Sequence, residues 1–161
     1  TSDSYGIENI LTGKPSKLYD FNASFSIFQQ KLNGTNLQSD ALKTMLNGFG
    51  KIINNFGFGK GSKVQVIANY TSAVTTPQGN LTPIYFIDLG YQQKVGKNAR
   101  FGLTVVDIFN TLQSGTRLNT DGFTSLRTSK ADTRAILVTF AYSFRTTVKD
   151  KMLENKFSRE W

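Results

Sequence analysis

Residues 132–144 alternate bulky apolar side chains with small or weakly polar ones. A period of two predicts a β-strand, because successive side chains of a strand point to opposite faces. A tilted strand needs about 9–11 residues to cross a bilayer, and the alternating segment has that length. One face carries Ile136, Val138, Phe140, Tyr142 and Phe144, and the other carries Ala135, Leu137, Thr139, Ala141 and Ser143. A soluble sandwich strand alternates in the same way, so the membrane interpretation depends on whether the rest of the chain repeats the pattern.

Six further segments repeat this alternation and are predicted as strands. They are residues 5–13, 18–32, 43–58, 63–73, 82–95 and 99–110. The pattern is clearest in residues 18–32, where an aromatic and aliphatic set from Tyr19 to Ile27 opposes a polar set from Asp20 to Ser26. Alternation changes parity at Val106 and Ile108, which predicts a β-bulge there. As an alternative to this strand and loop assignment, residues 39–46 could form a helical turn within the loop.

The predicted connections are of two lengths. Short connections lie near Pro15, Gly61 and Lys97, and long polar loops are predicted over residues 33–42, 74–81 and 111–130. Outer-membrane barrels have short periplasmic turns and longer external loops, so this sorting favours a barrel. The Gly-Lys-Gly-Ser sequence at 59–62 is predicted to be a turn rather than a phosphate-binding loop, because its spacing differs from that motif. Residues 119–122 are predicted to be a plain turn in preference to a calcium site.

Composition limits the chemistry that the chain can perform. Cysteine and histidine are both absent, which removes disulfides, thiolate ligands and the commonest general base. We therefore expect that the chain is not an enzyme and that it has no catalytic residue, no metal site and no cofactor. The net charge is +8, but the cations are scattered beside turns, so no nucleic-acid partner is expected. No run of about 18 apolar residues occurs, which excludes a membrane helix.

Three motifs resemble those of TonB-dependent outer-membrane receptors. The Ser-Tyr-Gly-Ile-Glu sequence at 4–8 resembles their Gly-x-Glu strand opening. Residues 106–111 resemble the motif of their penultimate strand, with Asp107, Ile108, Phe109 and Asn110 as the motif residues. Phe140, Tyr142 and Phe144 resemble the aromatic closing strand that the barrel-assembly machinery reads. The Asp-Thr-Arg sequence at 132–134 is most similar to the Bacteroidota branch. The resemblance covers nearly all of residues 4–144.

This resemblance implies energised uptake of a nutrient across the bacterial outer membrane. It also implies a lipid bilayer as surroundings, the barrel-assembly machinery as an assembly partner, and contacts with TonB and a surface lipoprotein through other regions. Polar residues are predicted to line a lumen, and Asp107 is predicted to have a structural hydrogen-bonding role. The predicted lumen residues are Glu8, Asn22, Ser24, Gln65, Asn69, Asp88 and Gln92.

The predicted fold is therefore an all-β, antiparallel, up-and-down transmembrane β-barrel segment of about seven strands. Residues 1–145 are expected to form the C-terminal strands of a larger barrel, and residues 146–161 a periplasmic C-terminal tail. An open sheet cannot lie in lipid with unpaired edges, so we expect the remaining strands and plug of the same barrel, or another chain, to pair with it. Two alternatives stay open: a barrel fragment held by the assembly machinery, and a soluble β-sandwich binding module.

Overall fold

The computed structural model describes residues 2–33, 42–76, 79–120 and 122–144. Within these ranges the chain forms eleven strands and one short 3-10 helix, η2 (Gly59–Gly61). The strands are β1 (Ser2–Ser16), β2 (Tyr19–Asn33), β3 (Leu42–Phe58), β4 (Ser62–Thr71), β5 (Val74–Thr76), β6 (Gly79–Leu81), β7 (Ile84–Val95), β8 (Ala99–Val106), β9 (Ser114–Thr120), β10 (Phe123–Ser129) and β11 (Ala135–Tyr142). In the described ranges, no helix is both long and apolar enough to span a membrane. The predicted tail, residues 146–161, lies outside the described residues.

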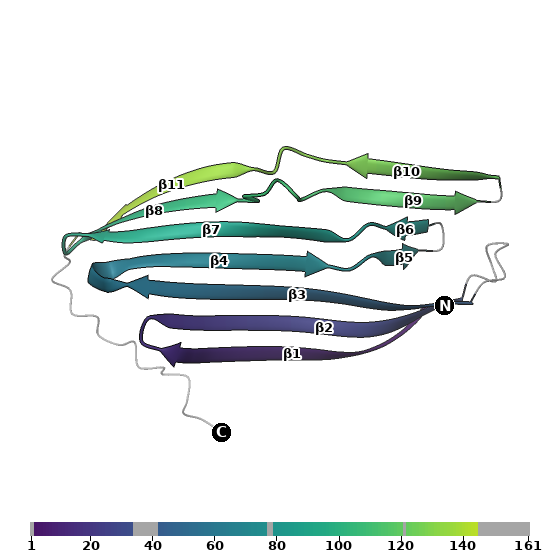
Figure 1. The fold of residues 1–161 in the computed structure, drawn as a ribbon, viewed down its shortest axis with the longest axis horizontal. Coiled ribbons are helices and arrows are strands. Elements are labelled where there is room, and N and C mark those ends of the chain that lie inside the picture. The colour runs from purple at the N-terminus through teal and green to yellow at the C-terminus, as the bar shows by residue number, and fades with distance from the viewer. Residues whose placement is uncertain (1, 34–41, 77–78, 121, 145–161) are drawn as a thin grey trace, which may run out of the picture.

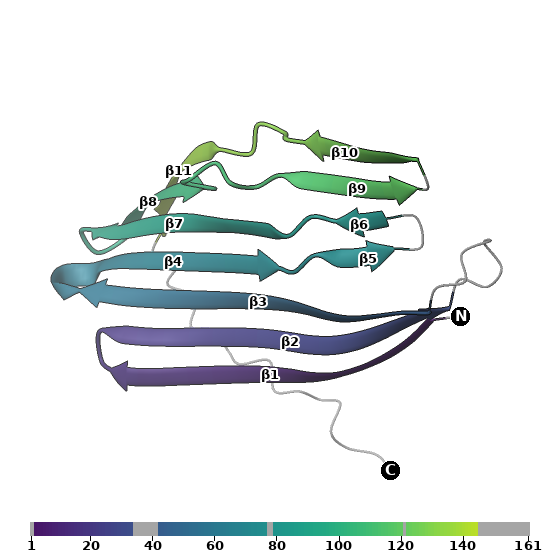
Figure 2. The ribbon, with the colours of Figure 1, turned by 45° about the vertical axis from the view of Figure 1, so that its right-hand side comes forward.

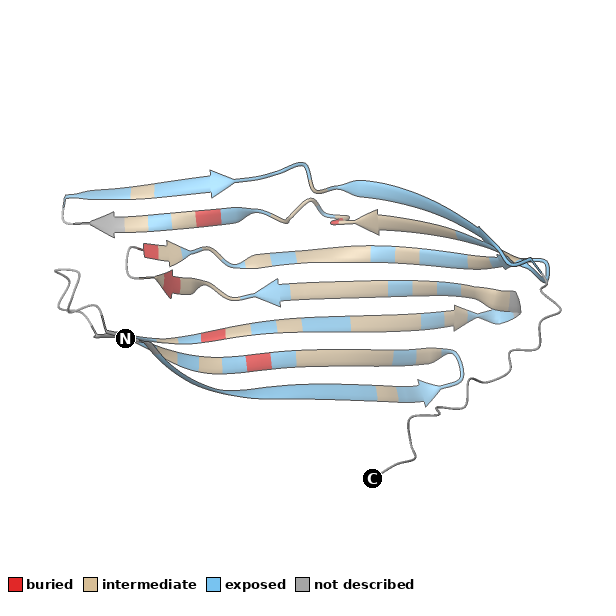
Figure 3. Cartoon of the chain, turned by 180° about the vertical axis from the view of Figure 1, so that it is seen from behind, coloured by how far each residue is buried: buried red, intermediate tan, exposed pale blue. Residues whose placement is uncertain are grey.

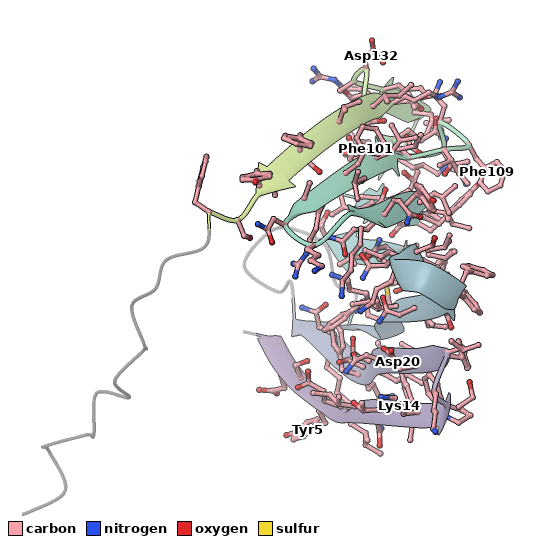
Figure 4. The ribbon with its side chains drawn as sticks, turned by 90° about the vertical axis from the view of Figure 1, so that its left-hand side faces the viewer. Tyr5, Lys14, Asp20, Phe101, Phe109 and Asp132 are labelled. Carbon is pink, nitrogen blue, oxygen red and sulfur yellow. The ribbon has the colours of Figure 1, made fainter. Side chains whose placement is uncertain are left out.

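Seven strands form one antiparallel sheet in the order β1-β2-β3-β4-β7-β8-β11. The predicted up-and-down arrangement is confirmed, and the sheet is not closed into a barrel. Seen along its strands, it bends into an arch with β1 and β11 at its two ends (Figure 4). Short turns join β1 to β2, β3 to β4 and β7 to β8 at one end (Figure 1). We call this the short-turn end.

A second sheet of four strands, in the order β10-β9-β6-β5, extends the first one away from the short-turn end (Figures 1 and 2). Two of the predicted long loops are therefore wrong: residues 74–81 contain β5 and β6, and residues 111–130 contain β9 and β10. The polarity of a segment does not exclude a strand here. A strand with water on both faces needs no alternating apolar side chains, because its backbone hydrogen bonds to neighbouring strands hold it in place. We call these four strands the upper sheet.

Two further local predictions are corrected by the structure. No bulge forms at Val106, because β8 ends there and Asp107 takes a left-handed backbone conformation with a φ of 49°. The helical turn proposed over 39–46 does not form in its described part, since residues 42–46 belong to β3 and pair with β2. The predicted long loop over 33–42 lies mostly outside the described residues.

The sheet is a single layer without an apolar core. Among the described residues no hydrophobic side chain is buried, whereas Ser26, Asn47, Thr75 and Asp107 are. The edge strands β1, β10 and β11 are exposed almost throughout (Figure 3). The side chains therefore meet either solvent, lipid or protein that lies outside this sheet.

Candidate functional site

The strand register places most of the apolar side chains of the seven-stranded sheet on one face, with a few, such as Ile53, Ile67 and Leu137, on the other. Directly paired residues of neighbouring strands share a face, so each row of partners can be followed across the sheet. One row contains Tyr19, Phe56, Val64, Tyr91, Leu103 and Val138. The next contains Phe21, Asn54, Val66, Leu89, Val105 and Ile136. We call this the apolar face.

Aromatic residues border the apolar face toward both ends of the strands. Near the short-turn end, Tyr19 stacks on Phe56 with ring centroids 4.9 Å apart, and its hydroxyl donates to Asn54 Oδ1 at 2.9 Å. Toward the other end, Tyr70 and Tyr85 are direct cross-strand partners. Tyrosine suits a membrane–water boundary, because its ring is apolar and its hydroxyl needs a polar partner.

The opposite face is polar, and the seven predicted lumen residues all lie on it. Rows of partners join Glu8 to Ser26, Asn22 to Asp88, and Ser24 to Asn69. Amide side chains form a ladder across three strands: Asn55 Nδ2 donates to Asp20 Oδ1 at 2.7 Å, and Gln65 Nε2 donates to Asn55 Oδ1 at 2.8 Å. We call this the polar face. That it borders a water-filled lumen stays a prediction.

A hollow of about 300 Å³ lies on the polar face at β3, β4, β7, β8 and β11. Its lining includes Gln65, Gln92, Thr104 and Thr139. Gly90 and Gly102 also line it, and the missing side chain of Gly102 leaves the space that Thr139 Oγ1 occupies. All of its lining residues except Tyr91 belong to the polar face, which indicates that this face is the inner, concave side of the arch.

The penultimate-strand motif forms a tight turn between β8 and β9 with a buried carboxylate. Asp107 is fully buried, and its Oδ1 accepts from the Thr111 amide at 2.8 Å. Its Oδ2 accepts from Thr133 Oγ1 at 2.6 Å and from the Leu112 amide at 3.1 Å. The Asp107 amide donates to Asp88 Oδ1 at 2.9 Å. One carboxylate thus joins the segment before β9 to the segment before β11, across the break between the two sheets.

The local sequence explains why the chain turns here. Asp107 and Asn110 both have positive φ, at 49° and 56°, and Asp and Asn are the side chains other than glycine that best tolerate this conformation. The Asn110 amide donates to the Asp107 carbonyl at 2.8 Å, which closes the turn. Phe109 is left on the outer side of the arch, 64% exposed (Figure 4). Sequence reasoning missed Thr133 and Asp88 as partners, because only the folded register brings them to the motif.

The predicted closing strand β11 is one edge of the sheet. Phe140 and Tyr142 lie on its apolar face, 69% and 50% exposed, and Phe144 follows at 83%. The Tyr142 and Phe144 rings meet edge to face with centroids 4.9 Å apart. Within the described residues β11 pairs with β8 alone, so its outer edge carries unpaired backbone groups.

A family model for the outer membrane protein beta-barrel family matches residues 1–142. The chain belongs to this family. No curated protein and no solved structure matches it. Membership places this barrel chain in the bacterial outer membrane, in agreement with a sheet that has one apolar and one polar face.

The two open edges of this barrel chain run in the same direction. Six consecutive antiparallel pairings separate β1 from β11, so the first and the seventh strands are parallel. Joining these edges directly would create a parallel pair in an otherwise antiparallel wall. The motif at 4–8 lies in β1 and the aromatic motif lies at β11, so the two edges carry two of the three motifs.

Proposed function

We propose that this chain forms the C-terminal strands of a larger outer-membrane barrel of the TonB-dependent receptor type, in its Bacteroidota branch. Such a barrel takes up a scarce nutrient with energy delivered through TonB, and it performs no chemistry on the substrate. The remaining strands and a plug come from the same polypeptide, the bilayer surrounds the apolar face, and the barrel-assembly machinery inserts the protein. TonB and a surface lipoprotein act through other regions of the protein.

The observation that carries this proposal is the pair of unpaired, parallel edges on a two-faced sheet. Each backbone group left unpaired in hydrocarbon costs several kcal/mol, so a sheet open at β1 and β11 needs further strands in lipid. Antiparallel closure requires an odd number of them, because β1 and β11 run the same way. Bacterial barrels have even strand numbers, and seven plus an odd number is even.

The transport part of the proposal is supported by the motifs and by the polar face. The motif at 4–8 opens an edge strand, the motif at Asp107 ends β8, and the aromatic motif follows on β11. This is the order in which receptors of this type carry them. The polar face supplies amide, hydroxyl and carboxylate groups on the concave side of the arch.

A second candidate is a barrel segment held by the assembly machinery, and the exposed outer edge of β11 favours it. A soluble sandwich has less support, because its strands would bury apolar residues between two layers and no hydrophobic residue is buried in the described chain.

Photo-crosslinking in cells separates these candidates. A photoreactive amino acid at Leu137, on the edge strand, is expected to crosslink within the same full-length polypeptide. The same probe at Leu89, in the middle of the sheet, is the control, since its neighbours on both sides are already known. A stable adduct of the Leu137 probe with a foreign chain would support the assembly candidate instead. A monodisperse protein in detergent-free buffer would contradict both membrane candidates.

Energised uptake is tested by comparing nutrient accumulation in cells that have the gene, lack it, or lack TonB. Both deletions are expected to abolish accumulation of the same nutrient. Accumulation that persists without TonB would refute the receptor assignment while leaving the barrel itself intact.

A further inference from the structure

Three cations gather on the polar face near the short-turn end, on three neighbouring strands. They are Lys63 on β4, Lys94 on β7 and Arg100 on β8. Lys94 is the direct cross-strand partner of Arg100, and Lys63 is the partner of Gln92, two residues before Lys94. The register has no shift between these positions, so all three side chains share the face that carries the hollow.

This arrangement costs stability as the described chain stands. Direct cross-strand partners have Cβ atoms about 4.5–5.5 Å apart, and like charges placed there repel. In the described ranges, none of the three cations has an ion-pair partner. Asp20, which lies one row of partners away from Lys63, accepts a hydrogen bond from Asn55, and Asp88 lies further off, four residues before Gln92 on β7. An unfavourable juxtaposition that folding does not need is a mark of a functional site.

The hollow offers room and hydrogen-bond donors, and the Lys94–Arg100 pair lies outside its lining, one row of partners closer to the short turns. Lys63 lines it directly, together with the side chains of Gln92, Thr104 and Thr139. Its volume of about 300 Å³ is at the lower end of what small-ligand sites provide, about 300–1,000 Å³. Carboxylate and phosphate oxygens accept hydrogen bonds from lysine and arginine head groups and from the amide and hydroxyl groups around them.

We propose that this cationic groove, defined by Lys63, Lys94, Arg100 and Gln92, binds a small solute that carries carboxylate or phosphate groups. The proposal rests on the proposed function, because it needs the polar face to border water inside a barrel. A bound oxyanion removes the repulsion between Lys94 and Arg100 and accepts hydrogen bonds from the donors of the hollow. The concave position turns the groove away from the lipid, and the size of the hollow suits a small solute better than a polypeptide segment.

Calorimetric titration of the full-length protein in detergent tests the groove, with inorganic phosphate and citrate as probes at constant ionic strength. The triple variant K63Q/K94Q/R100Q is expected to bind at least one probe about tenfold more weakly, because its charge-assisted hydrogen bonds are lost. The control K14Q/K17Q/K97Q removes the same charge from exposed positions in and beside the short turns, and its affinity should stay within about twofold of the parent. Equal weakening in both variants would show general charge attraction and overturn the proposal.

Two further measurements keep the outcome unambiguous. Without oxyanion, K63Q/K94Q/R100Q should be at least as heat-resistant as the parent, since repulsion is removed; a large loss would show that the cations are structural and contradict the proposal. A water-soluble maleimide should label Gln92→Cys on the polar face and spare Leu89→Cys on the apolar face in vesicles. If that labelling holds but neither phosphate nor citrate binds the parent, the groove proposal alone fails. If both cysteines label equally, the proposed barrel fails as well.

Discussion

Replacing Leu89 by arginine tests which face of the sheet meets lipid. Leu89 lies on the apolar face of β7 between Tyr85 and Tyr91, with Val66 and Val105 as its cross-strand partners. An arginine on the lipid face costs about 2–4 kcal/mol near the bilayer midplane and about 0–1 kcal/mol near the interfaces. Leu89→Arg should therefore cost about 2–4 kcal/mol, which is roughly 30- to 800-fold in the folding equilibrium.

Two matched variants show whether this cost comes from lipid. Thr104→Arg lies on the polar face opposite Gly90, where there is room and a hydrophilic lining, so its cost should stay below about 1 kcal/mol. Phe140→Arg lies on the apolar face closer to the short-turn end, where Gln93 already shares its row, so its cost should be about 0–1 kcal/mol.

The assay is urea-dependent folding of the full-length protein into lipid vesicles, with the folded fraction read from the heat-sensitive electrophoretic shift. We expect Leu89→Arg to lower the free energy of unfolding far more than the other two variants do. Equal penalties for Leu89→Arg and Thr104→Arg would mean that both faces are packed against protein, and the membrane assignment of the apolar face would be refuted.

Two other substitutions follow from single contacts. Asp107→Asn places an amide group among donors that now meet carboxylate oxygens, so hydrogen exchange at the Thr111 and Leu112 amides should accelerate and protease should cut the β9–β10 hairpin sooner; unchanged exchange would contradict the role of this turn. Gly102→Ala should destabilise the sheet by about 1–3 kcal/mol, because a Cβ there would overlap Thr139 Oγ1, and Thr139→Ala in the same chain should restore most of the loss. Gly90→Ala is the control, since its nearest neighbour would be Gln65 Cβ at 3.7 Å. Unfolding in urea measures all three, and a double variant no better than Gly102→Ala would refute the overlap.

The sequence predicted the seven strands of the larger sheet because half of their side chains are apolar at a period of two. This signal exists where one face of the strand is apolar and the other is not, as from Ile136 to Tyr142. It fades in β5, β6, β9 and β10, where neither face needs to be apolar, so these segments were expected to be loops. A backbone ladder forms whatever the side chains are, and hydropathy does not report it.

The sequence also identified Asp107 but not its partners. Thr133 lies 26 residues further along the chain and Asp88 lies 19 residues before it, so only strand pairing brings them together. The same holds for Lys94 and Arg100, whose facing positions depend on the register of β7 and β8. Patterns local in sequence predict faces, whereas contacts between strands follow from register.

The turn at Asp107 is one of the places where the chain leaves the seven-stranded sheet and enters the upper sheet. Within a ladder, a slip of one residue turns every side chain to the other face. Between β8 and β9 and between β10 and β11 the chain leaves the ladder of paired strands before it pairs again. Residues added to or removed from the upper sheet therefore leave the register of the seven-stranded sheet unchanged. Insertions and deletions in the upper sheet can thus change its length and its side chains without changing which face each side chain of the seven-stranded sheet occupies.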